Sequence, residues 1–439
     1  MSADYRKNHY VPVWYQKRFI PAAQKKRELF YLDLHPTNGY RDAAGRFHLE
    51  SGLHHWGPRS CFCEQDLYTT LLQSEPSTEI ERVLFGPIDS EGRTAMEAFG
   101  NFSYQADALR SFDALLNYLS AQKFRTPKGL SWLEGQVGPQ HRDELLNLMV
   151  RLRNMYHAIW AECVWLIADA SKSNTKFIVS DHPVTVYNRA CGPRSEWCRD
   201  SNDPDIRYHA THTLFPLSTE KALILTNLSW VRNPYQPERG IRPNPTLARA
   251  GIFKFMDVQS ERHLSEQEVL EINFIIKSRA ARYIAAAQEE WLYPERYVSR
   301  SNWATFGDGY LMMPEPRLIH GGGTVMMGYD DGSVHASDEY GRRPWEVGYE
   351  TGAGANESAA LDRFKGEFAR LHGPSLRARV RHGEHLSLSC ATEEQHRYHL
   401  SLEVEGKRAM RREQSRATRP PTGTESVHFR DFLRRRRRS

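Results

Sequence analysis

The chain has 439 residues, of which 40% are hydrophobic and 11% aromatic, so it can hold more than one domain and a sizeable core. Charged residues make up 26%, an ordinary globular value that excludes disorder of the whole chain. The net charge of +5 arises at the end of the chain, because residues 405–439 contain twelve basic and four acidic side chains. The rest is mildly acidic, so an argument from charge for nucleic-acid binding concerns only the tail.

Neither a signal peptide nor a membrane span is expected. The first ten residues are polar, and the longest apolar run, 158–170, is interrupted by Glu162 and is too short to cross a bilayer. We therefore expect a cytoplasmic protein that does not associate with membranes. The six cysteines are sparse for this length, and a disulfide framework is not expected in a reducing compartment.

Hydrophobic spacing predicts helices and strands in alternation along the first 295 residues. The predicted helices are 13–19, 91–99, 106–124, 140–170 and 265–288. The predicted strands are 28–34, 176–180, 184–187, 213–216 and 222–227. Residues 36–60 are rich in Gly, His and Arg and are predicted to form a loop. This order indicates an α+β domain over 8–295, helix-rich with a small mixed sheet.

The composition changes after Trp303. Three glycines precede TVMMGY, the turn sequence DDG and then SVHAS, which together predict a β-hairpin over 324–337. We expect a small β-containing appendage over 305–405. The sequence leaves open whether it folds independently. Residues 406–439 are almost devoid of apolar side chains until their end and are predicted to form a disordered basic tail.

Four motifs occur in the order typical of one uncharacterised bacterial family. They are NHYVP at 8–12 with Trp14-Tyr15 and Lys17-Arg18-Phe19 after it, QKFRTP at 122–127, FIVSDHPV at 177–184, and Asn273. This pattern resembles the domain-of-unknown-function family numbered four-two-three-eight, over about 290 residues. The chain departs from it at Val13 and Gln16, and the resemblance does not extend to 305–439. The family implies no established activity.

The polar residues of these motifs form the candidate site, His9, Gln122, Arg125 and Asp181, to which Glu81 is added from the intervening segment. Gln122 and Arg125 share one helix face. Asp181 follows a hydrophobic strand, where functional groups are often placed. Asp181 and Glu81 could ligate a divalent cation, Mg²⁺ or Mn²⁺, while Arg125 holds a phosphate. This combination suggests a metal-dependent phosphodiester hydrolase, a nuclease being one form.

Each of these residues also has a structural interpretation. Asp181 can bond the backbone of its own turn, His9 can brace the first helix, and Arg125 can pair with a Glu from 79–91. The spacing matches no characterised catalytic motif. A non-catalytic binding or regulatory protein therefore stays open as the alternative.

Two further features suggest a zinc site and a nucleic-acid contact. His54-His55 with Cys61-x-Cys63 could hold zinc, although a C-x-C pair is awkward for both sulfurs and zinc is the less favoured metal. The run Arg434 to Arg438 could contact the phosphates of a nucleic acid through the tail. The Walker A, dinucleotide-binding and nucleophile-elbow motifs do not occur, which disfavours those three enzyme classes.

Overall fold

The computed structural model describes residues 7–65, 67, 85–100, 107–137, 142–198, 203–244, 258–299, 302–322, 325–328, 330–332, 334–343 and 353–380. The fold class is α+β, as predicted. The longer helices are α3 (Gly86–Gly100), α4 (Asp107–Phe124), α5 (Pro127–Val137), α6 (Arg142–Ala161), α8 (Glu266–Arg279) and α9 (Ala353–His372). The shorter helices are α1 (Val13–Gln16) and α7 (Leu228–Arg232).

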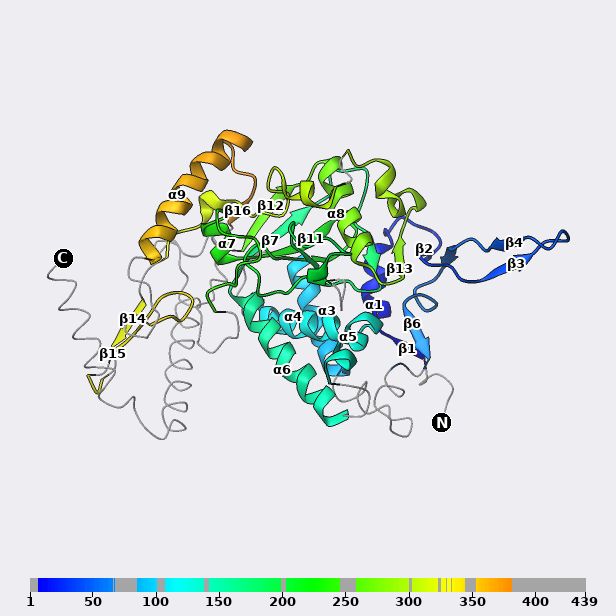
Figure 1. Cartoon of the computed structure of the whole chain (residues 1–439), viewed down its shortest axis with the longest axis horizontal. Coiled ribbons are helices and arrows are strands. Elements are labelled where there is room, and N and C mark those ends of the chain that lie inside the picture. The colour runs from blue at the N-terminus through cyan, green and yellow to red at the C-terminus, as the bar shows by residue number, and fades with distance from the viewer. Residues whose placement is uncertain are drawn as a thin grey trace.

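The large sheet has six strands in the order β16-β12-β7-β11-β10-β9. Their bounds are β16 (Arg379–Val380), β12 (Gln259–His263), β7 (Cys163–Asp169), β11 (Lys221–Asn227), β10 (His212–Pro216) and β9 (Thr185–Tyr187). All neighbours are antiparallel except β12 and β7, which run parallel, so the sheet is mixed as expected. In Figure 1, α3 to α6 lie below its central strands and α8 lies above them.

A second, four-stranded sheet joins the beginning of the chain to its middle. Its order is β5 (Leu53–Trp56), β2 (Leu29–Asp33), β13 (Tyr283–Ala286) and β8 (Val179–Ser180). Two small ribbons complete the N-terminal part, β1 (Lys7–His9) with β6 (Cys63–Gln65), and β3 (Gly39–Arg41) with β4 (Phe47–Leu49). The β3–β4 hairpin extends away from the body, at the right of Figure 1.

Several predicted elements were wrong in part. Residues 36–60 are not a loop, because β3, β4 and β5 lie within them. The helix predicted over 140–170 ends at Ala161, and the run CVWLIAD that follows is the buried strand β7. The helix predicted over 265–288 likewise ends at Arg279, before β13. Both apolar runs fit the helical and the strand period equally well. They form strands because both faces of the sheet are buried there.

The C-terminal part contacts the body. The predicted hairpin is confirmed as β14 (Val325–Gly328) with β15 (Val334–Ser337). Helix α9, which was not predicted, buries Phe364 and Phe368 in a cluster that also contains Trp230 of α7. The division into 8–295, 305–405 and 406–439 stays a prediction, and the basic tail lies outside the described residues.

Candidate functional site

Asp181 follows β8 and is buried against the beginning of β13. Its Oδ1 accepts the backbone N–H of Ala281 at 2.9 Å, and its Oδ2 accepts those of Arg282 and Tyr283 at 2.6 and 2.8 Å. Its own N–H donates to the carbonyl of Tyr283 at 2.9 Å. Burial raises the pKa of Asp181, although the three donors oppose that shift. The carboxylate therefore fastens one strand to another, and both of its oxygens are in use.

Gln122 and Arg125 connect three segments at the end of α4. The Gln122 amide donates to the carbonyl of Tyr10 at 2.8 Å and accepts from Nε of Arg125 at 2.6 Å. The Arg125 guanidinium pairs with Asp89 at 2.7 Å and lies over the ring of Tyr118. The partner of Arg125 thus lies in the predicted segment 79–91, but it is Asp89 and not a glutamate. These contacts favour a structural clamp for both residues.

The remaining predicted site residues do not complete a metal site within the described part of the chain. His9 contacts the carbonyl of Arg59 through Nε2 at 3.1 Å, and burial lowers its pKa. Glu81 lies outside the described residues. Among the described residues, no group of three His, Cys, Asp or Glu side chains lies close enough together to hold a metal ion. This holds also around Cys61 and Cys63.

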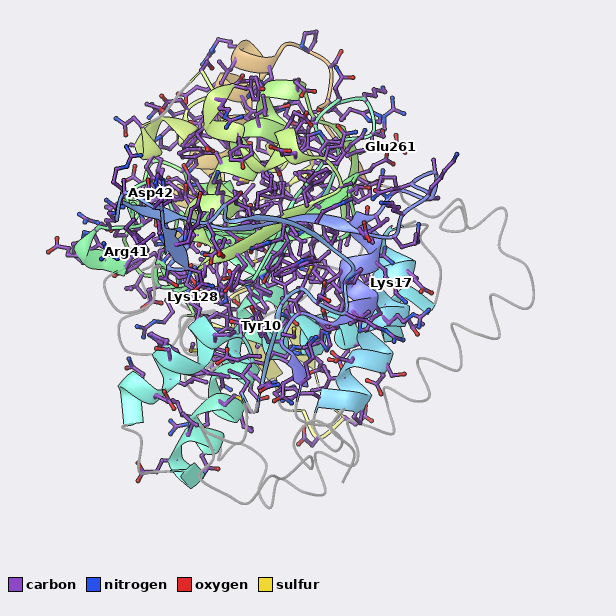
Figure 2. The ribbon with its side chains drawn as sticks, turned by 90° about the vertical axis from the view of Figure 1, so that its right-hand side faces the viewer. Tyr10, Lys17, Arg41, Asp42, Lys128 and Glu261 are labelled. Carbon is purple, nitrogen blue, oxygen red and sulfur yellow. The ribbon has the colours of Figure 1, made fainter. Side chains whose placement is uncertain are left out.

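A different polar cluster lies next to these motifs. Lys123 ends α4, Lys128 begins α5, His182 follows Asp181, and Asp203 precedes β10. The two lysines bind opposite oxygens of Asp203, with Lys123 Nζ at 2.5 Å and Lys128 Nζ at 3.1 Å. Burial raises the pKa of Asp203, but the two ammonium groups outweigh it and hold that pKa well below its usual range. Figure 2 labels Lys128 beside the helices drawn in cyan.

His182 is neutral in this cluster. Burial, reinforced by the two ammonium groups, lowers its pKa to about 3. Its Nε2 lies 2.9 Å from Nζ of Lys123 and 3.1 Å from Oδ2 of Asp203, and its Nδ1 lies 2.7 Å from Oγ1 of Thr126. Lys123 also donates to the carbonyl of Val184 at 3.2 Å, so His182, Val184 and Asp203 take the three positions around its nitrogen.

The cluster lines one side of a cavity of about 470 Å³. That volume is within the range of small-molecule sites. The rest of the lining combines apolar and aromatic side chains with Glu196 and the ion pair of Arg207 with Asp205; the apolar and aromatic members include Phe124, Trp132, Leu152, Met155, Tyr156, Trp197 and Tyr208. Trp197 is 40% exposed, so the cavity reaches the protein surface. A planar molecule can contact these rings while its polar end meets the lysines.

Two residues of this cluster lie within the sequence motifs but were not predicted as site residues. Lys123 lies within QKFRTP and His182 within SDHP. Their neighbours Arg125 and Asp181 were preferred because guanidinium and carboxylate groups suit phosphate and metal chemistry. Asp203 lies in a polar loop, and no local pattern distinguishes it from Asp200 or Asp205.

Residues 130–290 match the family described as "Protein of unknown function (DUF4238)". The resemblance predicted from the motifs is thereby confirmed, and FIVSDHPV and Asn273 lie within the matched range. No curated protein and no solved structure gave a significant match to the chain. In the described part of the chain, no helix has both the length and the apolar character needed to cross a membrane.

Proposed function

We propose that this chain, whose residues 130–290 match a family of unknown function, binds a small planar molecule that carries an anionic group. One observation carries the proposal. Lys128 Nζ donates to Asp203 at 3.1 Å and to the carbonyl of Arg279 at 2.7 Å, while its third N–H has no acceptor among the described residues. A buried ammonium proton without an acceptor is costly, and Lys128 lines the cavity, where an oxygen of a ligand can accept it.

The charge balance of the cluster supports an anion. Within it, the two ammonium groups of Lys123 and Lys128 face the single carboxylate of Asp203, and His182 is neutral. Elsewhere on the lining, Arg207 is paired with Asp205, and Glu196 contributes one further carboxylate. A carboxylate or phosphate of a ligand would complete the neutralisation and form a charge-assisted hydrogen bond.

The aromatic walls support a planar body for the ligand. Phe124 and Trp132 stack with their ring centroids 6.1 Å apart, and Tyr156 meets Phe124 edge to face at 5.0 Å. Trp197 and Tyr208 meet near the surface with centroids 6.5 Å apart. Rings placed on both sides of a cavity offer faces and edges on which a flat aromatic molecule can lie.

Binding is tested with 2-naphthoate and its uncharged amide. Trp132 and Trp197 line the cavity, so their fluorescence reports occupancy. We expect the carboxylate to bind and the amide to bind more weakly. Lys128→Met should weaken carboxylate binding about tenfold to a hundredfold, since a hydrogen bond to a charged group contributes about 1.5–3 kcal/mol.

Lys277→Met is the matched control. Lys277 also donates to one backbone carbonyl, that of Leu292 at 2.7 Å, and to one carboxylate, Glu295 at 2.8 Å, but it does not line the cavity. It should leave the affinity unchanged. Equal binding of naphthoate by wild type and Lys128→Met would contradict the proposal.

The metal-dependent phosphodiester hydrolase predicted from the motifs has less support. Asp181, Gln122 and Arg125 make structural contacts through the atoms that the reaction would need. Nucleic-acid contact through the Arg-rich tail stays a prediction as well. Its test is deletion of residues 411–439, which should abolish salt-sensitive binding of DNA or RNA; binding that persists without the tail would refute it.

A further inference from the structure

Two buried lysines share one carboxylate at the side of the cavity. The side chains of Lys123 and Lys128 are 6% and 8% exposed, and that of Asp203 is 8% exposed. Burial lowers the pKa of Lys123 to about 8, with the Lys128 ammonium adding to the shift. Burial lowers the pKa of Lys128 as well. A lysine in an apolar site beside a second cation is the arrangement that makes an amine nucleophilic near neutral pH.

The hydrogen bonds decide which of the two lysines is the reactive amine. Lys123 has three hydrogen-bonding neighbours, His182, the Val184 carbonyl and Asp203, which leave no open position on its nitrogen. Lys128 donates two hydrogen bonds, to Asp203 and to the carbonyl of Arg279, and it can lose its third proton while keeping both of them. The lone pair then occupies the position of that third proton, for which the described residues offer no acceptor, and Lys128 lines the cavity.

We propose that Lys128 forms an imine with a planar aromatic aldehyde or ketone bound in this cavity. The inference rests on the proposed function, because the carbonyl compound must first occupy the same space. The ligand class becomes a planar carbonyl compound, and the Lys123 ammonium keeps a positive charge beside the cavity that favours an anionic group on it.

The step is balanced without another reactant. The Lys128 lone pair forms a C–N bond while the C=O π bond breaks, and one proton of the amine moves to the oxygen to give a carbinolamine. The C–O bond then breaks, the second amine proton leaves with the hydroxyl as water, and a C=N bond remains. Asp203 keeps its charge throughout and holds Lys123 in place.

The experiment uses the full chain, 4-formylbenzoate as the aldehyde and sodium cyanoborohydride to reduce the imine to a stable secondary amine. Peptide mass mapping of the wild-type protein reads the modified position directly, so the result does not depend on a variant that folds. We expect Lys128 to be labelled at neutral pH at least about tenfold faster than Lys277, with an added mass equal to the aldehyde less one oxygen. Lys128→Met should lose this label, and Lys277→Met should retain it.

A parallel measurement separates the two proposals. 4-Methylbenzoate has the same shape but no carbonyl carbon able to react, and its binding is followed by thermal unfolding. Binding of 4-methylbenzoate without selective labelling of Lys128 would overturn the imine and leave the binding site intact. Neither binding nor labelling would overturn both. Labelling at Lys123 in place of Lys128 would refute the assignment drawn from the hydrogen bonds.

Discussion

Replacing Asp181 with Asn tests whether this residue holds the fold together or serves chemistry. The Asn side chain has nearly the same shape, but one carboxylate oxygen becomes an NH₂ group. Whichever way the amide turns, that group faces at least one of the backbone N–H groups of Ala281, Arg282 and Tyr283. The substitution therefore removes at least one hydrogen bond and places two donors against each other.

The magnitude follows from the contacts. A hydrogen bond to a charged group contributes about 1.5–3 kcal/mol, and a buried donor left without an acceptor costs a further 1–3 kcal/mol, roughly. The pKa of Asp181 is raised, so burial outweighs the stabilisation of the charge by the three donors, and the lower part of the combined range applies. We therefore expect the free energy of unfolding to fall by about 2–4 kcal/mol.

Urea unfolding, followed by both tryptophan fluorescence and circular dichroism, measures this loss. Asp42→Asn is the matched control, because Asp42, labelled in Figure 2, also accepts backbone N–H groups, from Ala44 and Arg46. It lies on the projecting hairpin, and its loss should cost less than about 1 kcal/mol. If Asp181→Asn unfolds within about 0.5 kcal/mol of wild type, the structural interpretation is wrong and the metal-site prediction regains its support.

Two further predictions concern stability. Burial lowers the pKa of His182 and of His212 to about 3 in the folded chain. In the unfolded chain these histidines take up protons near the ordinary histidine pKa of about 6.5, while in the folded chain they do not. The free energy of unfolding should therefore fall as the pH decreases below about 6.5, by about 1 kcal/mol for each histidine between pH 7 and 5.5. Urea titrations at both pH values measure the slope, and a His212→Gln protein whose slope equals that of wild type would contradict it. Gly92→Ala should destabilise the protein despite alanine's helix propensity, because its Cβ would lie 2.7 Å from Tyr118, whereas Gly366→Ala in α9 meets nothing within 4 Å and should stabilise by about 0.5–1 kcal/mol. Melting temperatures that move in the same direction would refute this contrast.

The predictable part of the fold is the part with one clear period. Helix α4 buries Leu115, Leu116 and Leu119 at helical spacing, and its predicted end at Phe124 is confirmed. The run in β7 has no polar alternation, because six of its seven residues are buried, and a helix fits its letters as well as a strand does. Its pairing with β11, almost sixty residues later, is what selects the strand, and no local pattern contains that information.

The site residues predicted from the motifs lie next to the proposed cluster but do not belong to it. Motif residues such as Gln122 and Asp181 make the hydrogen bonds that fix the segments carrying Lys123 and His182. The motifs therefore indicated residues that position the proposed cluster. The identity of the cluster depends on Asp203, which a fold brings to Lys123 across 80 positions. Such a contact is a property of the tertiary structure alone.

The four-stranded sheet has a consequence for how the chain assembles during synthesis. Strand β2 pairs with β13, and the ion pair of Asp33 with Arg282 at their ends spans 249 positions. At ribosomal speeds of about 5–20 residues per second, β2 waits roughly 12–50 s for its partner. During that interval Leu29 and Tyr31, which are buried in the finished protein, lack one side of their packing. Folding of this sheet is therefore late, and the nascent N-terminal segment exposes these apolar side chains until β13 has been synthesised.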